Sequence, residues 1–107
     1  MSFSNSPSIA IVVRTKNEER WIRHCLIQVF SQSYLSFSVV IVDNQSTDST
    51  VEIAKTFPVH SIHYIDEYMP GKALDIGIGS IKADYYVFLS AHCIPSGLNW
   101  LSWLLSC

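Results

Sequence analysis

The sequence predicts an α/β domain with a mostly parallel sheet and helices on both faces, a Rossmann-like arrangement. Short β-branched runs alternate along the chain with segments whose apolar residues recur every three or four positions. Strands and helices that alternate in this way form βαβ units, whose parallel strands are buried on both faces. A chain of 107 residues that is 49% hydrophobic has room for one core and not for two.

The first predicted unit joins a strand over residues 9–13 to a helix that starts at Glu18. The strand is a β-branched run, which is typical of a buried strand. Glu18 and Glu19 are expected in the first helical turn, where the helix dipole favours carboxylates. The apolar residues with helical spacing, which should form the buried face, are Trp21, Ile22, Cys25, Leu26, Val29 and Phe30.

The second predicted unit begins with a strand over residues 37–42 and continues through a polar turn. The stretch STDSTVEIAK then reads as a helix opening, with Asp48 in the first turn and Ser46 and Thr47 as capping residues. Pro58 closes this helix.

The last predicted elements are two strands with a helix between them. Residues 59–65 alternate in polarity as a short strand does, and residues 85–89 form the last strand. A turn at Pro70 and Gly71 precedes the helix, in which Gly77 and Gly79 each cost about 1 kcal/mol relative to alanine. The predicted buried face of this helix consists of Ala73, Leu74, Ile78 and Ile81.

Composition limits the domain organisation and the partners. Residues 1–8 are rich in serine and are expected to be disordered, and residues 9–107 form a single domain that is expected to be incomplete at its apolar C-terminal end. A net charge of -2 argues against nucleic acid as the partner. No apolar run is long enough to span a bilayer and no signal peptide is recognisable, so we expect a cytoplasmic protein, free or peripheral to the inner face of the membrane.

Polar side chains follow three of the predicted strands. Because ligands of such sheets bind at the carboxyl ends of the strands, these clusters predict a binding crevice. Thr15, Asn17 and Asp43 can hydrogen-bond a nucleotide base or a ribose hydroxyl. For Asp43, the alternative is a carboxylate that only caps the following turn.

Four stretches together resemble the nucleotide-sugar-binding half of the family 2 glycosyltransferases, which are inverting enzymes of the GT-A fold. They are IVVRTKNEE, VVIVDNQSTDST, PGKALDIGIGSIKADYYVFL and the closing P..LNWL. The resemblance extends from about Ile9 onward. It implies a nucleotide diphosphate sugar, UDP-linked, that is transferred to a glycan or lipid-linked acceptor in cell-surface polysaccharide synthesis. It also implies that Thr15, Glu18 and Asp43 surround the base.

Two cations are candidates for contact with the diphosphate. Lys72 follows the Pro-Gly turn just before a helix N-terminus, which also attracts anions, and by resemblance this segment approaches the nucleotide sugar. The alternative is a solvated surface lysine. Arg14 is the second candidate, and its alternative is likewise a surface charge. Asp75 stands where relatives usually carry asparagine.

The end of the last strand departs from the family pattern. Relatives carry Asp-x-Asp there, with the first carboxylate facing the ribose and the last one binding Mn²⁺ or Mg²⁺, whereas this chain has Ser90, Ala91 and His92. Ser90 can still bond a ribose hydroxyl. A neutral His92 can ligate a divalent cation, with weakened binding because two negative charges are lost. The alternatives are a hydrogen-bonded His92 without metal, or a protonated His92 that stabilises the leaving phosphate.

Whether the chain is an enzyme stays open at this level. Inversion needs a carboxylate base from a segment beyond the metal motif, so no catalytic residue is assigned. The alternative function is a non-catalytic truncated remnant or a nucleotide-binding or interaction module, which could self-associate through its apolar C-terminal end. A receiver-like domain phosphorylated on Asp43 is a third hypothesis, but Arg14, Thr15 and Lys16 stand where it needs acidic residues.

Overall fold

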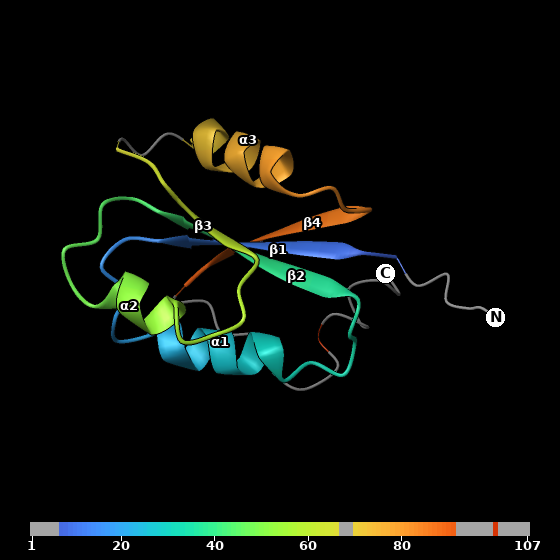
Figure 1. Ribbon diagram of the computed structural model, residues 1–107, viewed down its shortest axis with the longest axis horizontal. Coiled ribbons are helices and arrows are strands. Elements are labelled where there is room, and N and C mark those ends of the chain that lie inside the picture. The colour runs from blue at the N-terminus through green and yellow to red at the C-terminus, as the bar shows by residue number, and fades with distance from the viewer. Residues whose placement is uncertain (1–6, 67–69, 92–99, 101–107) are drawn as a thin grey trace.

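The computed structural model describes residues 7–66, 70–91 and 100, and within them it contains one parallel sheet with helices on both faces (Figure 1). The predicted fold class is confirmed. The strands, in the spatial order β3-β2-β1-β4, are β1 (Ile9–Thr15), β2 (Phe37–Asp43), β3 (Ser61–Tyr64) and β4 (Tyr85–Ser90). The helices are α1 (Ile22–Phe30), α2 (Thr50–Ala54) and α3 (Pro70–Ser80). In this part of the chain, no helix has the length and apolarity that crossing a bilayer requires.

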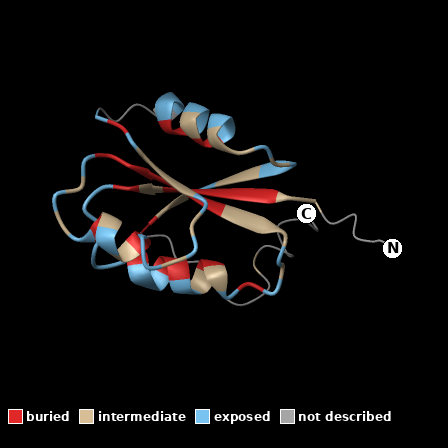
Figure 2. Ribbon diagram, in the orientation of Figure 1, coloured by how far each residue is buried: buried red, intermediate tan, exposed pale blue. Residues whose placement is uncertain are grey.

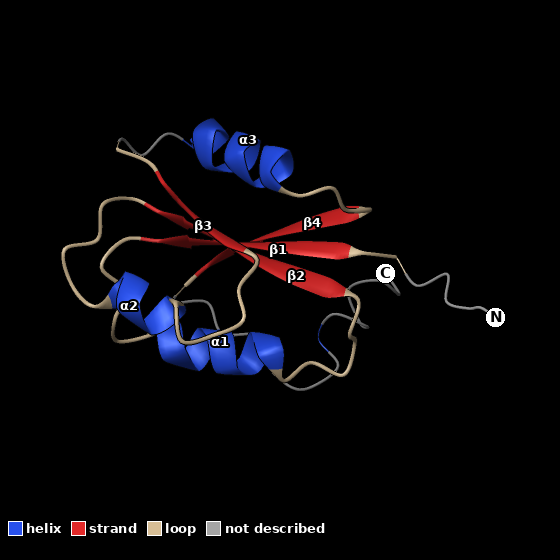
Figure 3. Cartoon of the chain, in the orientation of Figure 1, coloured by secondary structure: helices blue, strands red, loops and turns tan. Residues whose placement is uncertain are grey.

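The strand order explains why the helices lie on opposite faces. The chain steps from β1 to β2 to β3 in one direction, with α1 and α2 on one face of the sheet (Figure 3). It then returns past β2 and β1 to reach β4, and α3 lies on the other face. Crossovers of one hand place their helices on opposite faces when the direction reverses. The direction changes between β1 and β4, and the carboxyl ends of these two strands therefore flank the topological switch point.

Alternation along the strands divides the apolar residues between two cores. Figure 2 shows the buried residues concentrated in the central strands and on the inner surfaces of the helices. Beneath α1 and α2, the core contains Ile11, Val13, Ile41, Leu26 and Val29, all 0% exposed, and Trp100 packs against it. Beneath α3, the core is smaller and contains Val12, Val40, Val42, Ile65 and Ala73.

Helix α1 begins later than the sequence pattern indicates. It starts at Ile22, so the prediction that Glu18 and Glu19 occupy its first turn is wrong. Asn17 has a left-handed φ of 51°, which no α-helix can include, and the chain after it forms a turn in which the Glu18 carbonyl accepts the N–H of Ile22. Trp21 is 43% exposed, whereas Ile22, Cys25, Leu26 and Val29 are buried as predicted and Phe30 is partly buried.

Helix α3 turns a different face to the sheet from the one predicted. Ala73 is buried as expected and Ile81 packs against the same core, but Leu74 and Ile78 are 39% and 52% exposed. Gly77 takes the inner position instead. A Cβ atom added to it would lie 2.6 Å from Cγ2 of Val12, so the glycine allows the helix backbone to approach β1 closely. A residue that lowers helix propensity is therefore required here by packing.

Candidate functional site

Thr15 and Asp43 meet at the carboxyl edge of the sheet. They are the last residues of β1 and β2 and are paired in register. The Thr15 hydroxyl donates a hydrogen bond to Asp43 Oδ1 at 2.5 Å, and both residues are 1% exposed. Asp43 also accepts bonds from the hydroxyl of Ser46, at 2.6 Å, and from its N–H, at 2.9 Å. The carboxylate is thus held from both sides, by a strand residue and by the turn that follows it.

Asn17 joins the loop after β1 to the loop after β2. Its N–H donates to Ser46 Oγ at 2.8 Å, and its side-chain oxygen accepts the N–H of Thr47 at 2.7 Å. The prediction that Ser46 and Thr47 cap α2 is therefore wrong. They tie the two loops together instead. Since Ser46 also contacts Asp43, the position of that carboxylate depends on both loops.

Glu18 extends the same connection towards α2. Its N–H donates to Thr50 Oγ1 at 2.8 Å, and next to it the carboxylate of Glu19 accepts the N–H of Ser49. Asp48 lies before the helix and not in its first turn as predicted, and its Oδ1 accepts the N–H of Thr50, the first residue of α2, at 2.9 Å. The two loops that follow the candidate base-binding residues Thr15 and Asp43 are therefore interlocked.

The hydrogen bonds around Asp48 change its acidity. Partial burial works to raise the pKa of this carboxyl group. The bonds donated by the side chain and backbone of Thr50 and by the backbone of Glu19 outweigh that effect, and the pKa of Asp48 is lowered from 3.8. The group is accordingly ionised at neutral pH, next to the N-terminus of α2.

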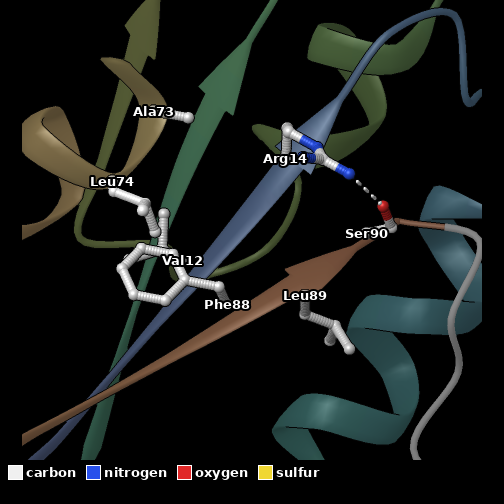
Figure 4. Close-up of a pocket in the computed structure, with 7 residues that line it drawn as sticks. All are labelled: Val12, Arg14, Ala73, Leu74, Phe88, Leu89 and Ser90. Atoms are coloured by element: carbon white, nitrogen blue, oxygen red, sulfur yellow. Dashed lines mark hydrogen bonds between the residues drawn. The ribbon is translucent and has the colours of Figure 1, made fainter. Parts of the chain in front are cut away.

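Ser90 and Arg14 form a second pair on the other face of the sheet. Nη2 of Arg14 donates to Ser90 Oγ at 3.0 Å, between neighbouring positions of β1 and β4 (Figure 4). Both residues line a cavity of about 280 Å³. Figure 4 shows Leu89 pointing away from this pair, towards the α1 face. Arg14 and Thr15 are consecutive, so the two polar pairs share one edge of the sheet but project from opposite faces.

Lys72 lies in the first turn of α3 and is exposed, and its Nζ lies 3.6 Å from Oδ1 of Asp66. An exposed ion pair of this kind contributes little to stability. Asp75 is exposed on the same helix.

The described residues do not fit a divalent cation at the end of β4. His92, the predicted metal ligand, lies outside the described residues. Within the part of the chain that the structure describes, no group of three His, Cys, Asp or Glu side chains could hold a metal ion. At Ser90 itself, a neutral hydroxyl faces the guanidinium of Arg14, and a positive group repels a second cation.

Two site features escaped the prediction from sequence. Ser46 was assigned to a helix cap, although a serine three residues after a strand-end aspartate is also the pattern of a turn closed by the carboxylate. The contact between Arg14 and Ser90 spans 76 positions and depends on strand order, for which no local signal exists.

A parallel sheet with polar side chains at its switch point defines the class of α/β domains that bind ligands at the carboxyl edge. Within this class, the chain belongs to the family described as Glycosyl transferase family 2, whose sequence profile matches residues 10–105. The predicted family is therefore confirmed.

One similar protein is the dolichyl N-acetyl-alpha-D-glucosaminyl phosphate 3-beta-D-2,3-diacetamido-2,3-dideoxy-beta-D-glucuronosyltransferase of Methanococcus voltae. It is 32% identical over 95 residues, which are 81% of this chain and 30% of the relative. The chain thus spans less than a third of the length of that enzyme.

Two solved structures share the fold. Residues 1–349 of Staphylococcus aureus TarS, in complex with UDP, superpose with a TM-score of 0.81 at 21% identity, over 92% of this chain and 31% of that one. The mannosyltransferase PcManGT of Pyrobaculum calidifontis, in complex with GDP-Man and Mn²⁺, gives a TM-score of 0.73 at 24% identity, over 85% and 29%. At these identities the likeness establishes the fold.

Proposed function

We propose that this domain binds a nucleotide diphosphate sugar, UDP-linked, and forms the donor-binding part of a glycosyltransferase that acts on a glycan or lipid-linked acceptor in cell-surface polysaccharide synthesis. The observation that carries the proposal is the buried pair of Thr15 and Asp43 at the carboxyl ends of adjacent strands, beside the switch point. Family membership and the UDP complex of TarS support it.

Each proposed contact follows from the chemistry of the side chain. Asp43 is an acceptor that suits the N–H of a pyrimidine base, with Thr15, Asn17 and Glu18 around it. Ser90 can exchange a hydrogen bond with a ribose hydroxyl. Lys72 supplies a positive charge at the N-terminus of α3, where a phosphate is favoured.

Sugar transfer would form a bond from an acceptor hydroxyl oxygen to the anomeric carbon while the bond from that carbon to the diphosphate breaks. The nucleoside diphosphate leaves with the electron pair, and a carboxylate base takes the hydroxyl proton. None of the described residues is assigned as this base. The weakly held divalent cation and its ligand His92 stay predictions, as does a cytoplasmic location at or near the membrane.

Calorimetry with UDP tests the proposal. We expect weak but saturable heat from the wild-type chain, and loss of that heat in Asp43→Asn, which keeps the shape of the side chain but removes its charge. Glu52→Ala, on the exposed side of α2, is the control and should bind as the wild type does. Circular dichroism must show that all three chains are folded. A folded wild-type chain that gives no heat at millimolar UDP contradicts the proposal.

A non-catalytic nucleotide-binding module is the alternative function. The hydroxyl of Ser90 beside Arg14, where relatives carry the carboxylate that faces the ribose, favours it. Nucleotide binding without sugar transfer, measured on the longest natural form of the protein, would support this alternative. Detectable transfer would exclude it.

A further inference from the structure

The pair formed by Arg14 and Ser90 occupies the switch point of the sheet. Arg14 is on β1 and Ser90 on β4, the two strands between which the direction of the chain reverses. The side chain of Arg14 is partly buried, and its contact with Ser90 Oγ directs the guanidinium towards the carboxyl end of β4 (Figure 4). The fold therefore places a permanent positive charge where ligands of such sheets bind.

The surroundings strengthen that charge. The cavity beside the pair is lined by apolar side chains of three elements, among them Val12, Leu74 and Phe88. Figure 4 shows them grouped on the α3 side of the sheet, with Arg14 and Ser90 beyond them. Apolar walls lower the local dielectric constant, and charge interactions are stronger there than in bulk water. Among the described residues that line the cavity, none is acidic.

We infer that Arg14 supplies the positive charge for the diphosphate of the donor, held in place by Ser90, and that donor binding in this chain does not require a divalent cation. The inference rests on the proposed function. A guanidinium presents several N–H donors in a planar fork that matches phosphate oxygens. It also repels a divalent ion from the same place. The neutral hydroxyl of Ser90 orients the guanidinium.

A purely structural role for Arg14, as a tie between β1 and β4, makes a different prediction. Loss of a tie lowers the stability of the sheet and weakens the binding of every ligand to the same extent. Loss of a phosphate contact weakens the binding of a ligand in proportion to the number of its phosphates. Comparing uridine, which has no phosphate, with UDP separates the two roles.

The experiment measures uridine and UDP binding by calorimetry in EDTA and in Mn²⁺, with the wild type and four variants. In the wild type, UDP should bind equally well in both buffers. Arg14→Gln should weaken UDP binding by about tenfold or more, which is the effect of one charged hydrogen bond, and should leave uridine binding unchanged. Arg14→Lys, which keeps the charge and packs similarly, should retain part of the affinity. Ser90→Asp should abolish binding in EDTA because its carboxylate neutralises Arg14.

Lys82→Gln is the matched control, because it removes one positive charge from the exposed loop before β4, away from the carboxyl edge, and should leave both ligands unaffected. A wild-type chain that binds UDP only with Mn²⁺ overturns the inference but not the proposed function. Equal weakening of uridine and UDP by Arg14→Gln overturns it too, in favour of the structural tie. A folded chain that binds neither ligand removes the proposed function and the inference with it.

Discussion

The Thr15 hydroxyl donates to Oδ1 of Asp43 across two neighbouring parallel strands at 2.5 Å, and neither side chain is more than 1% exposed. A buried carboxylate is costly unless donors surround it. Thr15 and Ser46 provide those donors, so Asp43 is held in one orientation before any ligand arrives. Such preorganisation lowers the entropic cost of binding.

Removing the Thr15 hydroxyl should destabilise the fold. Thr15→Val preserves the shape of the side chain but leaves Asp43 without one donor, and we expect a loss of about 1–3 kcal/mol in the free energy of unfolding. Urea denaturation of Thr15→Val, Asp43→Asn and the double variant gives the coupling energy between the two side chains. A bond to a charged acceptor predicts a coupling of about 1.5–3 kcal/mol. Additive effects of the two substitutions would contradict a direct interaction.

Gly77 and Gly79 should respond in opposite ways to alanine. Gly77→Ala places a Cβ 2.6 Å from Cγ2 of buried Val12, and the resulting overpacking, about 1–3 kcal/mol, exceeds the gain in helix propensity of about 1 kcal/mol. Gly79 has no neighbour within 4 Å of its added Cβ, so Gly79→Ala should stabilise the chain by about 0.5–1 kcal/mol.

Thermal or urea unfolding of both glycine variants checks this contrast. Val12→Ala makes room for the added methyl group, and it should therefore cost less stability in the Gly77→Ala background than in the wild type. If Gly77→Ala is as stable as Gly79→Ala, α3 does not approach β1 as closely as described.

Asp48 should make stability depend on pH at the acid end. Because its pKa is lowered in the folded state, the unfolded chain binds more protons in this range, and the contribution of Asp48 is present above about pH 4 and lost as the pH falls through the folded value. Asp48→Ala removes the acceptor for Thr50 and should cost about 0.5–1.5 kcal/mol at pH 7, the value of one hydrogen bond that solvent partly screens.

Urea denaturation at several values between pH 7 and the acid limit of folding measures this effect. The difference in stability between the wild type and Asp48→Ala should shrink below about pH 4. A difference that stays constant over the whole range would show that the charge of Asp48 does not contribute.

Asn17 combines two roles that substitutions can separate. Asn17→Ala removes the acceptor for the Thr47 N–H and places alanine, which tolerates the left-handed region poorly, at a φ of 51°. Together these effects should lower the free energy of unfolding by about 2–3 kcal/mol. Asn17→Gly loses the same bond but adopts this φ without strain, so it should cost about 1 kcal/mol less. Equal effects in urea denaturation would show that backbone strain is unimportant here.

Local patterns predicted most of the fold and the strand ends at which the polar side chains stand. Strands β1 and β2 were recognisable because parallel strands buried on both faces need continuous β-branched runs. The predicted start of α1 was wrong because Asn17 and Glu18 form hydrogen bonds with the loop after β2, about 30 positions further along the chain. Local helix propensity does not reflect such distant contacts.

The succession of strands and helices, and the strand ends at which the polar side chains stand, follow from the order of residues, since periodicity and β-branching act over a few positions. Which of those side chains touch is a tertiary matter. Thr15 meets Asp43 across 28 positions, and Arg14 meets Ser90 across 76. These contacts exist only once β1 lies between β2 and β4, because hydrogen-bond pairing of strands, and not local propensity, brings such distant residues together.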